Sequence, residues 1–390
     1  MISPSVGPAE FGVSPTSGFL PDRDPLGRLS SPFDAWEAVA QDLPKFLMSD
    51  RFRTIVEKLP EFPTGCLVAQ DEWERAMVLL SYLGHAYVWS GDRPATVLPA
   101  NLAIPWHAVA QRLGRPPVLS YASYCLHNWR RLEPDRPVET GNIALIQSFL
   151  GGQDEEWFVL IHVDIEQQAA PAIASLLPAQ QAVSERDEEQ LAGCLAEIEK
   201  ALHQINRVMD RMVERCDPYI YFHRVRPYIH GWRNHPDLPD GVVYEGVKEY
   251  GGRPQTFRGE TGAQSAIVPA LDALLGVQHG ADQLRSYLQE MRSYMPPGHL
   301  AFIEQVENGP SVREFAGSAG RKTVELYDAC LESVARFRSR HLEYAARYIF
   351  HQAQTDAKNP HDVGTGGTPF MPYLKKHRDE TVAHALGGSR

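Results

Sequence analysis

The chain has 390 residues, enough to bury a large core in one large domain or two. Its hydrophobic content of 43% fits an ordinary soluble globular protein, and its net charge of −11 argues against a nucleic-acid groove or an anionic membrane surface as the main partner. The five cysteines never form a C-x-x-C pair, which argues against a disulfide framework or structural zinc site and favours a reducing cytoplasm.

The first part of the chain is predicted to be an arm followed by helices. Residues 1–30 are rich in Pro, Ser and Gly, and we expect a flexible N-terminal arm rather than a signal peptide. Apolar residues at helical spacing then predict helices within residues 32–59, 70–89, 105–113 and 119–131. A turn near residues 149–153 is taken as the end of a small helical domain over residues 31–150.

The rest of the chain is predicted to be a larger helical domain over residues 151–390. Helical patterns cover residues 157–177, 184–216, 219–232, 264–275, 282–294, 299–307 and 322–354. The stretch 184–216 is expected to be the longest helix, with Ser184 as its cap. Strand signals are sparse, so the predicted fold class is all-α.

His341 interrupts the apolar side of the last long helical pattern. Tyr327, Leu331 and Val334 recur before it at steps of three and four. A buried imidazole needs a partner, because burying it unpaired is unfavourable. Haem iron is one such partner, but the local pattern alone favours a core histidine with an ordinary hydrogen bond.

Familiar catalytic motifs are missing from the sequence. It contains no G-x-S-x-G elbow, no P-loop and no H-E-x-x-H pair. The cluster Gly364-Thr-Gly-Gly-Thr368 follows no strand pattern, so it does not predict a dinucleotide site. Taken alone it predicts a loop, or a mobile lid that offers N–H groups and hydroxyls to a ligand.

Several motifs nevertheless occur in one order along about three quarters of the chain. They are Pro116-Pro-Val-Leu-Ser-Tyr121 with Asn128-Trp129, Pro227-Tyr-Ile-His-Gly-Trp232, Val243-Tyr-Glu-Gly246, Gly262-Ala-Gln-Ser265, Met291-Arg-Ser-Tyr-Met-Pro-Pro297, Pro310-Ser-Val-Arg-Glu-Phe315, Arg338-Ser-Arg-His341 and Gly364-Thr-Gly-Gly-Thr368. From about Leu98 to Leu386 the chain resembles the indoleamine 2,3-dioxygenase family. The resemblance implies a cytoplasmic haem b enzyme, monomeric or a small homo-oligomer, that inserts O₂ across the indole C2=C3 bond of L-tryptophan or a related indoleamine to give N-formylkynurenine.

The resemblance assigns residues to the proximal side of a haem. His341 matches the iron ligand, although His351 and His361 lie near the end of the same helical stretch and are alternative ligands. Asp272 matches an acidic residue that polarises the ligand histidine, and Arg338 matches an arginine that pairs with a haem propionate. Ser265 is taken as a further cofactor-binding residue.

Other matches fall on the substrate side. Arg226 matches the arginine that binds the substrate carboxylate. Arg224 is an alternative, and only the alignment of the downstream Gly231-Trp232 selects Arg226. Tyr121 and Phe158 match aromatic pocket walls. The remaining predicted substrate-binding residues are Phe222, Gly262 and Thr365, the last in a mobile loop near residues 360–369 that covers the pocket.

Two positions depart from the family's pattern. One alignment puts His162 where a serine is usual, and there it could accept the indole N–H; a second alignment puts Leu160 there instead. Tyr221 stands where phenylalanine is usual and adds a hydroxyl to the pocket. These changes motivate one alternative, an oxygenase that acts on a modified indole in secondary metabolism. A second alternative is a non-catalytic haem protein that binds or senses O₂, but Arg226 and Thr365 argue against it, because such a protein does not need to bind a carboxylate.

Overall fold

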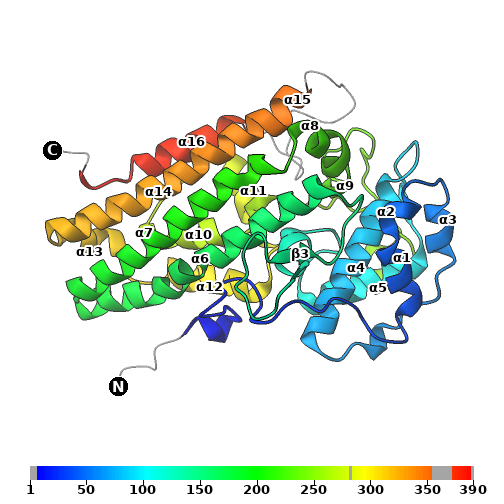
Figure 1. Cartoon of the computed structure of the whole chain (residues 1–390), viewed down its shortest axis with the longest axis horizontal. Helices are drawn as coiled ribbons and strands as arrows, with labels where there is room; N and C mark the ends of the chain where they lie inside the picture. Colours follow the sequence, from blue (N-terminus) through cyan, green and yellow to red (C-terminus); the bar gives the residue numbers. More distant parts are fainter. Residues whose placement is uncertain (1–6, 281–282, 354–370, 388–390) are drawn as a thin grey trace.

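The computed structural model describes residues 7–280, 283–353 and 371–387, and most of these are helical (Figure 1). The N-terminal part, at the right of Figure 1, holds five helices: α1 (Asp34–Gln41), α2 (Leu43–Phe46), α3 (Phe52–Glu57), α4 (Gln70–Trp89) and α5 (Ala100–Leu113). Helix α4 matches its predicted range of 70–89, and beyond its first turn every residue from Arg75 to Val88 is buried. The predicted all-α class is confirmed.

Most of the remaining helices form the other part of the molecule, at the left of Figure 1. They are α6 (Gln153–Glu185), α7 (Glu188–Asp210), α10 (Ile267–Leu275), α12 (Pro297–Glu307), α13 (Val312–Ser318), α14 (Arg321–Ala345) and α16 (Met371–Val382). The helices α8 (Pro218–Ile220), α9 (Arg226–Ile229), α11 (Gln283–Arg292) and α15 (His351–Ala353) lie between them in the sequence. Helices α6, α7, α14 and α16 pack side by side in that order.

In the described part of the chain, four very short strands form two small sheets. Strand β1 (Val97–Leu98) pairs in parallel with β4 (Val243–Tyr244), and β2 (Trp129–Arg131) pairs antiparallel with β3 (Ile143–Leu145). In the first sheet Val97 lies opposite Val243. Runs of two or three residues are too short to show the alternation of a strand, so the sequence did not predict them.

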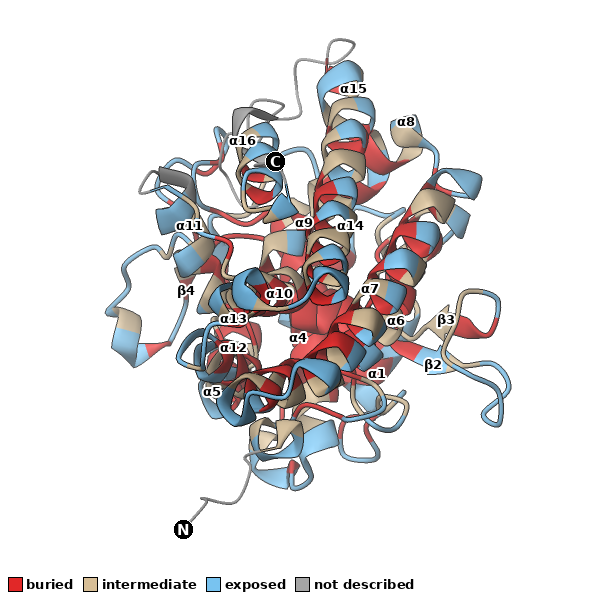
Figure 2. Ribbon diagram, turned by 90° about the vertical axis from the view of Figure 1, so that its left-hand side faces the viewer, coloured by how far each residue is buried: buried red, intermediate tan, exposed pale blue. Residues whose placement is uncertain are grey.

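Two hydrophobic cores lie in the two parts of the molecule, and the chain crosses between them. The first core contains most of the N-terminal apolar residues but also Val159 and Val163 from α6, and Ile229 to Val247 from much later in the chain. Helix α6 does begin near the predicted boundary at residue 150. The cores are nevertheless not separated at a single point of the sequence, and Figure 2 shows the buried faces turned inward throughout.

Two predictions differ from the structure. Residues 7–30 do not form a free arm, because Val13, Phe19, Leu20 and Leu29 are buried, each at most 3% exposed. The longest helix is α6 and not 184–216: it continues to Glu185, and Asp187 caps α7 by accepting a hydrogen bond from Gln190 N at 2.9 Å. Among the helices of the described ranges, none combines the length and apolar character needed to cross a membrane.

Candidate functional site: a cavity between His341 and an aromatic wall

A cavity of about 840 Å³ lies within the long-helix part of the molecule. Helices α6, α7, α10, α11, α14 and α16 and the segment before α10 all contribute side chains to it. Much of its wall is apolar, formed by Ile165, Leu202, Ile205, Leu271, Val277, Leu288 and Phe337. This volume lies within the range of about 300–1,000 Å³ that is usual for sites enclosing a small molecule.

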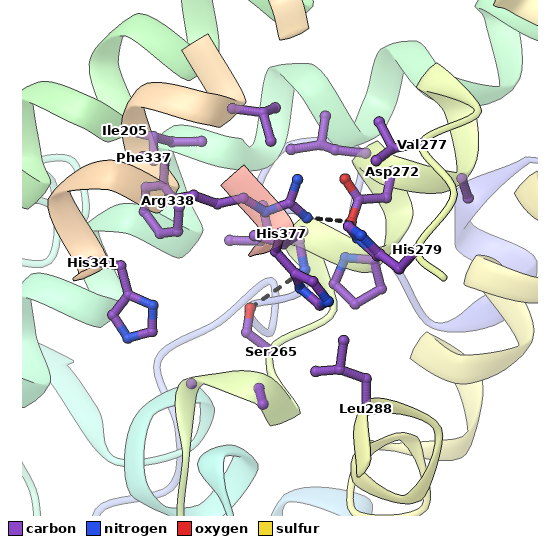
Figure 3. A pocket seen from close by; sticks show the side chains of 18 of the residues that line it. Ile205, Ser265, Asp272, Val277, His279, Leu288, Phe337, Arg338, His341 and His377 are labelled. Carbon is purple, nitrogen blue, oxygen red and sulfur yellow. Dashed lines mark hydrogen bonds and ion pairs between the residues drawn. The ribbon is translucent and has the colours of Figure 1, made fainter. Parts of the chain in front are cut away.

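His341 projects into this cavity from α14 (Figure 3). The apolar face predicted for this helix is buried, with Tyr327, Leu331 and Val334 at most 1% exposed. His341 itself is accessible, because its ring faces the cavity and not another side chain. Although the ring has accessible surface in the cavity, desolvation by the surrounding protein, and then the nearby His162, lower the pKa of His341 to about 4. The ring is therefore neutral near pH 7, the form that ligates a metal.

Aromatic side chains form another wall of the cavity. The Phe158 ring lies 4.6 Å from Tyr221 and 4.7 Å from His162, and the Tyr121 ring lies 6.0 Å from His162, as centroid distances. Tyr121 directly precedes a π-helical turn over Ala122–Leu126, and Tyr221 begins another over Tyr221–Val225. Such π-helical turns are rare and recur at functional sites, where they change the direction of side chains.

His162 presents an acceptor nitrogen on this wall. Its Nδ1 lies 2.7 Å from the carbonyl oxygen of Phe158, and since a carbonyl only accepts, Nδ1 carries the proton. Burial lowers the pKa of His162, so the ring is neutral and Nε2 keeps a lone pair. The structure brings His162 to the cavity, whereas Leu160, its alternative in the alignment, packs in the N-terminal core.

The predicted cofactor residues Arg338 and Asp272 meet at the edge of the cavity. Arg338 Nη2 lies 2.5 Å from Asp272 Oδ2, and Arg338 also donates to Thr381 Oγ1 on α16. Burial raises the pKa of Asp272, but Arg338 and His279 outweigh it, and the net shift is downward. The hydrogen-bond partners of Asp272 among the described residues are thus Arg338 and His279, and not His341 as the resemblance implied.

Ser265, the third predicted cofactor residue, lines the cavity beside a buried acid. Its hydroxyl donates to Glu166 Oε1 at 2.8 Å, and the Tyr121 hydroxyl donates to the same oxygen at 2.9 Å. Burial raises the pKa of Glu166 to about 7, although both hydrogen bonds oppose the shift. These bonds hold Tyr121 and Ser265 at fixed positions on the wall.

Not every predicted site residue reaches the cavity. Gly262 lines it, but Arg226 and Phe222 are fully buried and do not contribute to its wall. The Arg226 Cζ atom lies 5.4 Å from the centre of the Phe222 ring, and burial lowers the pKa of Arg226 to about 10, with Tyr221 opposing the shift. Arg226 stays charged near pH 7. Thr365 and the loop 360–369 lie outside the described residues.

Glu260 is a cavity residue that the sequence did not single out. Burial raises its pKa to about 8, so the carboxyl is mostly protonated near pH 7. A close approach of two backbone segments places it: a Cβ at Gly231 would lie 2.1 Å from Gly259 N, and one at Gly259 would lie 2.2 Å from Gly231 N. Glycine at both positions therefore allows this contact. The one feature of the sequence that could have drawn attention to Glu260 is the single Gly259 directly before it.

The fold is helical, and a neutral histidine, an aromatic wall and a guanidinium surround one large cavity. These features define a protein that encloses a ligand. Comparison with known proteins then identifies the group to which it belongs. The family model described as indoleamine 2,3-dioxygenase matches residues 7–384. The chain belongs to this family, as the ordered motifs predicted, and the match begins well before the predicted limit near residue 98.

Individual relatives agree over nearly the whole chain. Indoleamine 2,3-dioxygenase 1 of Rattus norvegicus is 35% identical over 400 residues, covering 97% of both chains. Indoleamine 2,3-dioxygenase 2 of Homo sapiens is 33% identical over 393 residues, covering 96% of this chain and 95% of its own. Indoleamine 2,3-dioxygenase acdA of Aspergillus candidus is 35% identical over 390 residues, covering 96% of both.

Proposed function

We propose that this protein is a haem-dependent dioxygenase that converts L-tryptophan, or a related indoleamine, to N-formylkynurenine. Both atoms of O₂ enter the product across the indole C2=C3 bond, so the reaction balances without another co-substrate. The observation that carries the proposal is the neutral imidazole of His341, which faces a cavity of about 840 Å³ in a member of this family.

The cavity residues fit a haem in three respects. His341 offers an unprotonated nitrogen, the form that would hold the haem iron. The apolar residues of the wall, such as Ile205 and Phe337, suit the faces of a macrocycle. Arg338 lies at the cavity edge; its guanidinium is bonded to Asp272 and Thr381, and with five N–H groups it keeps further donors for a second carboxylate such as a haem propionate. Haem iron would supply the binding and activation of O₂.

The remaining residues would bind and orient the substrate. The lone pair of His162 Nε2 suits the indole N–H, and the rings of Phe158 and Tyr121 suit the indole face. Arg226 is the predicted partner of the substrate carboxylate; because it is buried behind the wall beside Tyr221, this role requires a movement of side chains when substrate binds. Thr365 is the predicted contact of the lid with the ammonium.

A second candidate is oxygenation of a modified indole. Tyr221 lines the cavity with a hydroxyl, and Glu260 adds a carboxyl that is protonated near pH 7. Both can hydrogen-bond a polar substituent on the indole ring, and a site built to pair such a group discriminates strongly against substrates that lack it. The ratio of kcat/KM for L-tryptophan to that for hydroxylated indoles decides between the two candidates.

The test is an absorption spectrum combined with turnover. Purified wild-type protein should show a Soret band, and the reduced protein should form N-formylkynurenine from L-tryptophan and O₂. His341→Ala should lose or strongly alter both signals, whereas His351→Ala, which removes the exposed alternative ligand, should keep them. A wild-type protein without a Soret band would refute the proposal, and haem binding without turnover of any indole would favour a non-catalytic haem protein.

A further inference from the structure

Beyond Arg338, two stacked histidines line the same end of the cavity (Figure 3). His279 follows α10 and His377 lies on α16, and their ring centroids are 3.7 Å apart with planes inclined by 12°. His279 is held between two carboxylates: Nδ1 lies 2.6 Å from Glu380 Oε2, and Nε2 lies 3.4 Å from Asp272 Oδ2. Both nitrogens of His279 are therefore already engaged.

His377 differs from its neighbour because its ring lacks such partners. The residue is 7% exposed, and in the described part of the chain its Nε2 is buried without a hydrogen-bond partner. Burial, followed by the charges of His279 and Arg338, lowers the pKa of His377 to about 3, so the ring is neutral and carries one N–H. A buried polar nitrogen without a partner is unfavourable and rare. Because His377 also lines the cavity, a ligand bound there can supply a hydrogen-bond partner for its ring.

The surrounding contacts hold His377 beside Arg338. Thr381, one helical turn further along α16, donates to the His377 carbonyl oxygen at 2.8 Å and accepts a hydrogen bond from Arg338. Because Arg338 belongs to α14, this contact ties the two helices together at the cavity. A neutral N–H donor and a guanidinium are thereby presented together, an arrangement that suits an acidic group.

A metal ion fits the cluster less well. His279, His377 and Glu380 do offer ligand atoms within 4.8 Å of one another. The two rings are stacked nearly parallel, however, so an ion in the plane of one ring lies outside the plane of the other. The Glu380 carboxylate is also paired with Lys376, at 3.4 Å from Nζ to Oε1. This geometry favours hydrogen bonding over metal ligation.

We propose that the ring N–H of His377 donates to a carboxylate of the bound haem, next to Arg338. The inference rests on the proposed haem-dependent function and adds a binding residue from α16 to it. Arg338 supplies the charge, and His377 supplies a second donor that reaches the cofactor from a different helix. Residues of both α14 and α16 would therefore bind the carboxylates of the haem.

The test compares two porphyrins in the full-length protein. Wild type, His377→Leu and His377→Gln are loaded with haemin or with haemin dimethyl ester, whose esters cannot act as anionic acceptors. The rate of transfer to an excess of an apo haem-scavenging protein is then followed at the Soret band. His203→Leu, which changes an exposed histidine of α7 remote from the cavity lining, is the matched control.

His377→Leu should release haemin about tenfold faster, which is equivalent to about 1.4 kcal/mol, while its release of the diester is unchanged. His377→Gln keeps an N–H donor and should release haemin within about threefold of wild type, which is less than half that free energy. Equal acceleration for both porphyrins would show a purely structural role and overturn the inference, as would no acceleration for either. Failure of wild type to bind haemin would overturn the proposed function as well, so the two failures are distinguishable.

Discussion

The low pKa of His341 leads to a prediction about haem binding in mildly acidic solution. Burial and the nearby His162 lower this pKa to about 4 in the protein without haem. Only the neutral ring can bind iron, so the neutral fraction sets the apparent affinity. At pH 5.5 an imidazole with the ordinary pKa of about 6.5 is about 9% neutral, whereas one with a pKa of about 4 is about 97% neutral.

Haemin binding through His341 should therefore weaken little between pH 7.5 and pH 5.5. An ordinary histidine would lose about tenfold in apparent affinity over this range, and His341 should lose less than about twofold. The measurement is a Soret titration of the apoprotein at both pH values, with circular dichroism to confirm that the fold persists.

A chemical control uses the same cavity. In His341→Gly, free imidazole added to the buffer should restore axial ligation, and in water it titrates at its ordinary pKa. The rescued variant should then lose at least about tenfold in apparent affinity at pH 5.5, where wild type does not. A tenfold loss in folded wild type would refute the reasoning, because it would mean that the protein does not desolvate His341.

Three further predictions concern substrate binding and stability. Arg226→Leu should lower kcat/KM for L-tryptophan by about tenfold to a hundredfold, mainly through KM, whereas the exposed Arg224→Leu should not; equal effects would contradict the assignment. Burial lowers the pKa of His85 to about 3, so below pH 6.5 this side chain binds a proton in the unfolded protein but not in the folded one. His85 should therefore account for a loss of about 1.3 kcal/mol of unfolding free energy between pH 7 and pH 5.5 in wild type. In urea unfolding, the loss between these pH values should be smaller by this amount in His85→Gln. Gly231→Ala would place a Cβ 2.1 Å from a backbone nitrogen and should destabilise by about 2 kcal/mol or more, while Gly193→Ala, with open space around it, should be tolerated in the same unfolding assay.

The long helices were predictable where their apolar residues follow a clean period. Helix α4 is an example, because its whole length carries that pattern and no proline interrupts it. Helix α6 was predicted too short: the predicted range 157–177 includes Pro171 but stops directly before Pro178, and proline usually ends a helix. The buried Ile173 and Leu176 each stabilise the helix by about 1.5–3 kcal/mol, which offsets a proline cost of about 3 kcal/mol.

The arm over residues 7–30 shows a different limit. Its content of Pro, Ser and Gly predicted flexibility, yet Phe19 and Leu20 are buried against the rest of the molecule. A few apolar residues without helical or strand spacing leave no periodic signal. Whether such residues pack depends on the surface that they meet, and that surface is formed by helices far away in the sequence, such as α12.

The site was predictable as a set of residue types but not as a set of contacts. The ordered motifs drew attention to His341, Asp272 and Arg338. They did not show that Asp272 pairs with Arg338, because those residues lie 66 positions apart and meet only in the folded chain. His377 was not singled out at all, since α16 was not predicted and a lone histidine has no recognisable pattern.

Burial gives the cavity a nearly neutral lining in spite of its many ionisable groups. Near pH 7 it keeps His341 and His377 uncharged and leaves Glu260 mostly protonated, with pKa values of about 4, 3 and 8. The charge of Arg338 is balanced by Asp272. Such a lining suits an apolar indole and O₂. Arg285 and Arg292 also line the cavity, and Arg292 is paired with Glu307. Arg226 is buried beside Tyr221 and still ionised, and the proposed function assigns the substrate carboxylate to it.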